Sequence, residues 1–221
     1  MKKVLSCLFV ISLLLLCLSG CEKAASPSSE PQTPPDSAAK EEEEEVYQPE
    51  VSAEEVAYHI IDAFIDGDLA AMAAYLSDQS EIPLAQLRAY LHTDEAFYAA
   101  CLTAFSRTQY TILSTSANER EAKVKVQLTA PDLGALLEQP FRMAKQQAET
   151  HPGPRCAERL AEQFDDELIE QISAEDVSTL KSTFTITFVN EDGRWRALAD
   201  EALYNALTGN LYAQFRRCED Q

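Results

Sequence analysis

Side chains that could hold a metal or act as nucleophiles are few and scattered in this sequence of 221 residues. Metal sites draw several ligands together at short spacings, and the pair His92 and Asp94 alone is a poor motif of that kind. We therefore expect surface histidines at His59, His92 and His151. The sequence also shows no nucleophile, base and orienting group in a recognisable set. These observations predict no catalytic residue, no metal and no cofactor.

The first 20 residues have the layout of an export signal. Lys2 and Lys3 form a short basic start, and the apolar run from Val4 to Leu18 is too short for a comfortable membrane span. The residues that follow, Ser19-Gly20-Cys21, complete a stretch that closely resembles the lipobox of bacterial lipoproteins. The resemblance implies cleavage before Cys21, a diacylglyceryl group on its thiol, and a lipid-anchored protein on the extracytoplasmic face of the cell membrane. An ordinary secretory signal with a chance cysteine is the alternative.

Residues 21–50 are predicted to be a tether, and residues 51–221 a single domain. The tether is rich in proline and serine and contains five consecutive glutamates, Glu41–Glu45, so it cannot bury enough apolar surface to fold. The domain holds 28 acidic and 14 basic residues. Because nucleic-acid binding needs a basic field, this balance argues against a nucleic-acid partner. It also argues against a domain that lies flat on anionic lipid.

The cysteines left after export and lipidation are Cys101, Cys156 and Cys218. An odd number in an exported chain permits one disulfide and one spare thiol. We expect a Cys156–Cys218 disulfide, with Cys101 buried as a small hydrophobe on a helix. Three reduced cysteines are the open alternative, because bridging geometry cannot be read from a sequence.

The domain is predicted to alternate helices with two hairpins. Ser52 and Glu55 form a capping box at the start of a helix, Gly67 ends that helix, and Asp68 caps a second helix from 69 to 76. A short helix is expected at 84–91, and a separate helix that contains Phe97 and Phe105 is expected to begin after a Thr93 cap. Further helices are expected at 133–149, 156–172 and 201–215. Alternating patterns predict strands at 110–115, 124–128, 183–188 and 194–198, and Asn190–Gly193 has turn chemistry.

Three stretches resemble the NTF2-like (cystatin-like) domains of bacterial lipoproteins: Ala53–Leu76, Tyr110–Leu128 and Thr183–Asp200. Their clearest parts are Ile65-Asp66-Gly67-Asp68-Leu69 and Asp192-Gly193-Arg194-Trp195. The resemblance implies an α+β fold in which N-terminal helices pack on a curved antiparallel sheet, with a helical insert and a C-terminal helix as additions. It also implies a pocket in the cone of the sheet, and four residues are candidates for its lining: Tyr58, Tyr110, Trp195 and Asp200.

These observations together predict a non-enzymatic binding role at the cell envelope. The occupant would be a small apolar ligand or an envelope protein partner. The alternatives are a structural spacer or assembly subunit, for instance a homodimer paired through the sheet, and a transporter-associated solute receptor. A further alternative is an NTF2-like enzyme that moves protons with Tyr58, Tyr110, Asp62 or Asp200.

Overall fold

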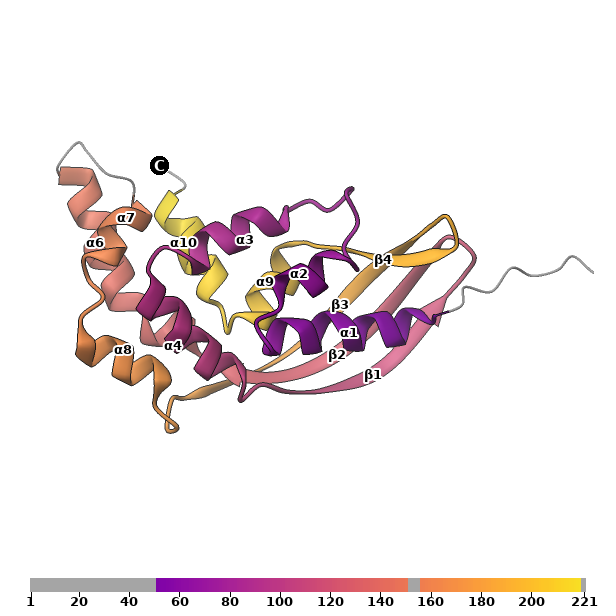
Figure 1. Ribbon diagram of the computed structural model, residues 1–221, viewed down its shortest axis with the longest axis horizontal. Coiled ribbons are helices and arrows are strands. Elements are labelled where there is room, and N and C mark those ends of the chain that lie inside the picture. The colour runs from indigo at the N-terminus through magenta and orange to yellow at the C-terminus, as the bar shows by residue number, and fades with distance from the viewer. Residues whose placement is uncertain (1–50, 151–155, 220–221) are drawn as a thin grey trace, which may run out of the picture. The chain divides into compact units, whose positions relative to one another are not determined.

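The first helix begins and ends at the predicted caps, and the second begins at its predicted cap. A computed structural model describes residues 51–150 and 156–219, which belong to one unit of the chain, Glu45–Gln221 (Figure 1). The predicted signal and tether lie outside the described residues. Helix α1 (Ala53–Ile65) starts with the Ser52–Glu55 capping box, and Asp68 caps α2 (Leu69–Ala73) by accepting a hydrogen bond from the Ala71 amide. Gly67 between them has a φ of 74°, as a glycine at this position of a helix end should.

Four antiparallel strands form one sheet in the order β1-β2-β3-β4. The strands are β1 (Gln109–Ala117), β2 (Glu121–Pro131), β3 (Thr179–Glu191) and β4 (Arg194–Leu198). On one face, side chains such as Val124, Val126 and Phe188 are fully buried, whereas Lys123 and Lys125 on the other face are exposed. The alternation confirms the predicted two-faced sheet.

Helices cover the apolar face of the sheet and gather at one of its ends. Figure 1 shows α1 lying lengthwise along the sheet, where it contacts β1, β2 and β4. Helix α9 (Glu201–Leu207) packs on β2 and β3. The expected α+β class, with N-terminal helices packed on an antiparallel sheet, is confirmed to this extent.

The remaining helices form a bundle beside the sheet. They are α3 (Leu84–Leu91), α4 (Glu95–Phe105), α5 (Leu133–Leu136), α6 (Glu138–Thr150), α7 (Cys156–Ala161), α8 (Asp166–Ser173) and α10 (Leu211–Glu219). Aromatic side chains join them: the Phe215 ring of α10 lies 4.7 Å from the Tyr90 ring of α3 and 4.9 Å from the Phe141 ring of α6, centroid to centroid. Phe97 of α4 stacks on Phe164, at 4.2 Å.

Several predicted helices are shorter than expected. The stretch 133–149 is divided into α5 and α6, and 156–172 into α7 and α8, where the Asp165 side chain caps α8 on the Leu168 amide at 2.8 Å. The final helix breaks at Gly209 and Asn210, whose φ angles are 56° and 63°. Helix α2 ends at Ala73 because the chain turns to pair Leu76 with Ala197 of β4.

The predicted Thr93 cap was wrong by one residue. Asp94 caps α4 by accepting a hydrogen bond from the Phe97 amide at 2.9 Å. The Thr93 hydroxyl instead donates back to the Tyr90 carbonyl at 2.7 Å, closing the end of α3. A carboxylate at the start of a helix also interacts favourably with the helix dipole, which a hydroxyl does less well.

Candidate functional site

A pocket of about 490 Å³ lies where the β3–β4 hairpin meets the start of α1. We call it the hairpin pocket. Its walls come from α1, from the segment Ala74–Tyr75 after α2, and from the turn and first half of β4: Val51, Val56, His59, Ala74, Tyr75, Asp192, Gly193, Arg194, Trp195 and Arg196. Its volume is within the range of small-molecule sites.

The hairpin turn and the edge of β4 shape this pocket. Asp192 and Gly193 both have positive φ angles, 50° and 82°, as a tight two-residue hairpin turn requires. Further along, the Ala197 amide donates to the Tyr75 carbonyl and the Ser77 amide donates to the Ala197 carbonyl, both at 2.9 Å. The edge of β4 is therefore closed at Ala197. Backbone groups two residues apart on a strand point to the same edge. The Trp195 amide and carbonyl therefore point to the edge where Ala197 bonds Tyr75 and Ser77, and this edge borders the pocket.

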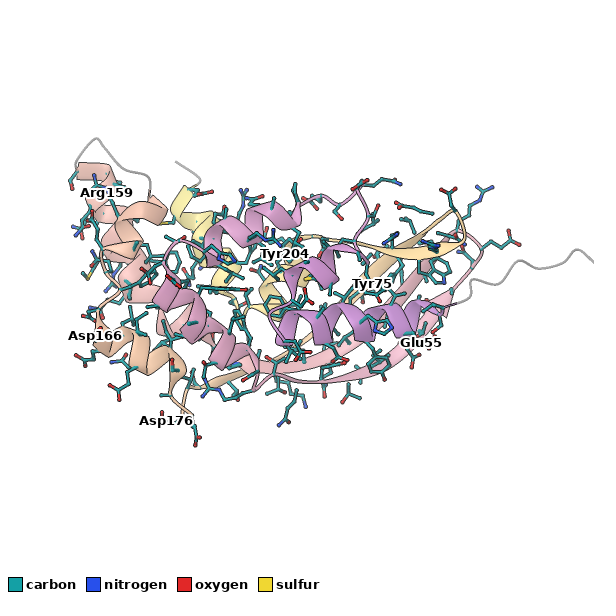
Figure 2. All side chains as sticks on the ribbon, in the orientation of Figure 1. Glu55, Tyr75, Arg159, Asp166, Asp176 and Tyr204 are labelled. Atoms are coloured by element: carbon teal, nitrogen blue, oxygen red, sulfur yellow. The ribbon has the colours of Figure 1, made fainter. Side chains whose placement is uncertain are left out.

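Aromatic rings provide the apolar part of the wall. The Trp195 side chain is 6% exposed, so its ring is anchored in the core and presents little surface. His59 of α1 stacks on Tyr75, with ring centroids 5.1 Å apart and an angle of 15° between the planes. Figure 2 shows Tyr75 between α1 and β4. The stack adds two rings to the pocket lining, and a planar group can pack against aromatic rings.

The pocket also carries positive charge in an otherwise acidic domain. The guanidinium groups of Arg194 and Arg196 make no ion pair or hydrogen bond with any described residue. Glu191, which is paired with Arg194 across the hairpin, forms no ion pair with it. One oxygen of Glu191 instead accepts hydrogen bonds from the Ser77 hydroxyl at 2.5 Å and from the side-chain amide of Gln79 at 3.2 Å. Asp192 is the carboxylate within the pocket lining.

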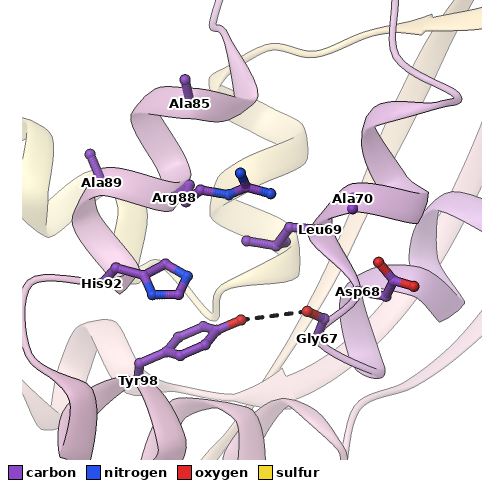
Figure 3. A pocket seen from close by; sticks show the side chains of 9 residues that line it. All are labelled: Gly67, Asp68, Leu69, Ala70, Ala85, Arg88, Ala89, His92 and Tyr98. Atoms are coloured by element: carbon purple, nitrogen blue, oxygen red, sulfur yellow. Dashed lines mark hydrogen bonds between the residues drawn. The ribbon is translucent and has the colours of Figure 1, made fainter.

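A second groove, of about 570 Å³, runs between α2, α3 and the start of α4 (Figure 3). Its lining includes Arg88 and His92, which are both exposed, and three exposed alanines, Ala70, Ala85 and Ala89. The Tyr98 hydroxyl donates to the Gly67 carbonyl at 3.4 Å across its base (Figure 3). This groove is more open than the hairpin pocket. We therefore take the hairpin pocket as the candidate site.

The structure separates the four residues predicted to line one pocket. Trp195 lines the hairpin pocket, but Tyr58 and Tyr110 meet between α1 and β1, with ring centroids 5.9 Å apart. The Tyr110 hydroxyl donates to an Asp62 oxygen at 2.6 Å, and burial together with this bond raises the pKa of Tyr110. Asp200 instead caps α9, accepting a hydrogen bond from the Leu203 amide at 2.8 Å. The interior of the sheet where all four were expected to meet is filled with side chains such as Phe188 and Ile186.

Sequence reasoning missed most of the hairpin pocket. His59 was expected at the surface without a role, and Tyr75, Arg194 and Arg196 were not singled out as site residues. One signal was present: arginines on both sides of Trp195, in a strand of a strongly acidic domain. The contribution of Tyr75 could not be anticipated, because it depends on the bridge between Leu76 and Ala197.

The cysteines are placed only in part. Cys101 is a free cysteine, fully buried on α4, and burial raises the pKa of its thiol. Cys218 on α10 is disulfide-bonded. The side chain of Cys156 lies outside the described part of the chain, so the Cys156–Cys218 pairing stays a prediction.

Two further findings concern metals and membranes. Within residues 51–150 and 156–219, no group of three His, Cys, Asp or Glu side chains lies close enough to hold a metal ion. None of the described helices has both the length and the apolar character needed to cross a bilayer.

The chain was compared with protein-family models, curated proteins and solved structures, and none of them matches it. The candidate site therefore rests on its own geometry. That geometry offers a pair of stacked rings, and, within the part of the chain that the structure describes, two guanidinium groups without partners and one open amide–carbonyl pair. Such a set can bind and orient a ligand.

Proposed function

We propose that this protein is a lipid-anchored, extracytoplasmic binding protein that holds a small ligand in the hairpin pocket. The observation that carries the proposal is the pocket itself, in which the stacked rings of His59 and Tyr75 lie with Arg194 and Arg196, whose guanidinium groups have no partner among the described residues. Sites of this kind combine a mostly apolar wall with a few polar groups that fix the orientation of the ligand.

Cys21 would attach the protein to the bilayer. The basic start, the apolar run and the small residues before Cys21 support this role, since two acyl chains are sufficient for stable anchoring. Residues 21–50 would then hold the domain away from the membrane. For the domain we propose NTF2-like ancestry, which the packing of α1 on a four-stranded antiparallel sheet supports.

We propose binding and not catalysis because the chemistry around the pocket is suited to holding a ligand. Its imidazole, His59, is engaged in a ring stack, and neither a serine nor a cysteine side chain is among the lining residues. The tyrosine–carboxylate pair that could move a proton, Tyr110 and Asp62, lies between α1 and β1 and is not among the residues that line this pocket.

Native mass spectrometry tests both halves of the proposal. The lipoprotein would be extracted gently from its own membranes and its mass compared with that of a Cys21→Ala variant. We expect a diacylglyceryl adduct on a wild-type chain that begins at Cys21, and an unlipidated variant that keeps its first 20 residues. A wild-type chain that still begins at Met1 without lipid would refute the anchor.

The same spectra test the binding role. We expect additional mass from a small passenger on the folded chain, released when the protein is denatured. A chain that carries lipid but no passenger, and forms a stable dimer, would favour the structural alternative of a spacer or assembly subunit.

A further inference from the structure

The open stretch of strand at the hairpin pocket is too short for a peptide. At one end, Tyr75 and Ser77 already occupy the backbone groups of Ala197, and at the other end the chain turns at Asp192 and Gly193. Only the amide and carbonyl of Trp195 remain at this edge. A peptide that extends a sheet needs several successive backbone pairs, so the geometry favours a compact ligand.

The charge around that edge favours an anion. Arg194 and Arg196 both line the pocket, and as residues two apart on β4 they project to the same side of the strand, the side opposite the buried Trp195, so they reach the pocket past the edge of β4. Glu191 accepts hydrogen bonds from Ser77 and Gln79 and forms no ion pair with Arg194, which leaves the Arg194 guanidinium available to a ligand. Asp192 is the opposing charge in the lining. Guanidinium groups bind carboxylate and phosphate oxygens by paired hydrogen bonds.

The opposite wall favours a flat apolar group. The stacked rings of His59 and Tyr75 form that wall, and Val51 and Val56 lie beside them in the lining. An aromatic or similarly planar group can lie against such rings while a charged group reaches the arginines.

We infer that the ligand of the hairpin pocket is a small organic oxyanion with a planar apolar part, bound through Arg194 and Arg196. The inference deepens the proposed function and rests on it. The oxyanion is a carboxylate or a phosphate, which the same guanidinium groups can bind.

The chain provides its own reporter for a test. Trp195 is the single tryptophan of the sequence, so a tryptophan-labelled sample gives one indole signal and one backbone amide signal by NMR, and both arise at the pocket. The lipidated protein in a nonionic detergent would be titrated with phenylacetate, phenyl phosphate, the neutral phenylacetamide and inorganic phosphate. We expect the first two to shift both Trp195 signals saturably, and more weakly as salt is added.

Matched variants assign the binding to the arginines. Arg194→Gln and Arg196→Gln should each weaken phenylacetate binding by about tenfold, the loss of one charge-assisted contact. Arg120→Gln removes the same charge from the neighbouring β1–β2 turn, outside the pocket lining, and should leave binding unchanged. Asp192→Asn keeps a residue that tolerates a positive φ while removing the opposing carboxylate, so it should tighten binding.

The outcomes separate the inference from the proposed function. Equal binding of phenylacetamide and phenylacetate, unaffected by either arginine variant, would overturn the oxyanion and leave the binding role standing. Equal binding of inorganic phosphate and phenyl phosphate would overturn the planar apolar part. No shift with any probe, together with no passenger in native spectra, would refute the binding role itself.

Discussion

Gly209 illustrates how a single residue determines the course of the chain. Its φ of 56° is strained for other residue types, and its carbonyl accepts a hydrogen bond from the Gly134 amide at 2.8 Å. A side chain at this position would overlap the backbone carbonyl of Pro131. The turn therefore depends on glycine for both its conformation and its packing.

Gly209→Ala should destabilise the protein by about 3 kcal/mol or more, because a rigid backbone clash is added to the conformational strain. Gly67→Ala is the matched control: its φ is also positive, but the new Cβ would meet the end of the Leu102 side chain, which can move. We expect the control to cost about 1–2 kcal/mol. Denaturant unfolding measures both, and equal losses would show that the contact with Pro131 contributes nothing.

Trp195 shows what could be known of the site from the sequence. As a tryptophan in a hairpin it was a candidate for pocket lining, and it does line a pocket. Its predicted companions were wrong for a physical reason: Tyr58 and Tyr110 lie between α1 and β1, and Asp200 is used as a cap. A sequence shows which side chains could take part, but long-range packing decides which of them meet.

Among the elements, α10 packs against three other helices through Phe215. This ring is 1% exposed and contacts Tyr90 and Phe141 by stacking and edge packing, with Phe97 6.3 Å away. The three partners belong to α3, α6 and α4. Phe215 therefore links four helices that are far apart in the sequence.

Phe215→Ala should cost about 3–5 kcal/mol, the range for truncating a buried phenylalanine. Hydrogen exchange should rise first in α3, α4, α6 and α10, and later in β2 and β3, whose pairing does not involve this ring. Tyr58→Ala, a truncation of an aromatic residue that is 39% exposed, is the control and should cost much less. Uniform acceleration across the sheet and the bundle would indicate one cooperative unit.

Element types followed from local patterns, while several element lengths did not. The Ser52 capping box and the alternation at 183–188 reproduce α1 and the core of β3 closely. The continuous helices predicted at 156–172 and 201–215 both proved to be pairs. Apolar periodicity continues across a break when both short helices pack on the same core, so periodicity alone could not reveal the breaks at Asp165 and Gly209.

At the scale of the whole molecule, buried tyrosines make folding sensitive to alkali. Burial raises the pKa of Tyr212 to about 12, from 10.0, and burial also raises the pKa of Tyr204 and of Tyr90. The folded state thus keeps these phenols protonated where the unfolded chain would ionise them. Their contribution to stability is complete below pH 10 and is lost as the pH rises through the folded-state values.

The free energy of unfolding should therefore be level up to about pH 10 and fall between about pH 10 and 12. Tyr212→Phe removes one of these phenols, so its alkaline slope should be shallower. Its stability at neutral pH should be equal or slightly higher, because the buried Tyr212 hydroxyl has no hydrogen-bond partner in the described part of the chain. Denaturant melts across this pH range measure both effects, and identical slopes for the two proteins would contradict the assignment to Tyr212.

The burial of Cys101 allows the rate of local unfolding around α4 to be measured. Its thiol is fully enclosed on α4 and is not bridged, so a thiol-specific reagent can reach it only when the helices around it separate. The labelling rate, followed on the peptide that contains Cys101, would measure how often that separation occurs while the rest of the molecule stays folded. For the proposed extracytoplasmic location, a reagent that does not cross the membrane would allow the same measurement on intact cells, with and without the proposed ligand.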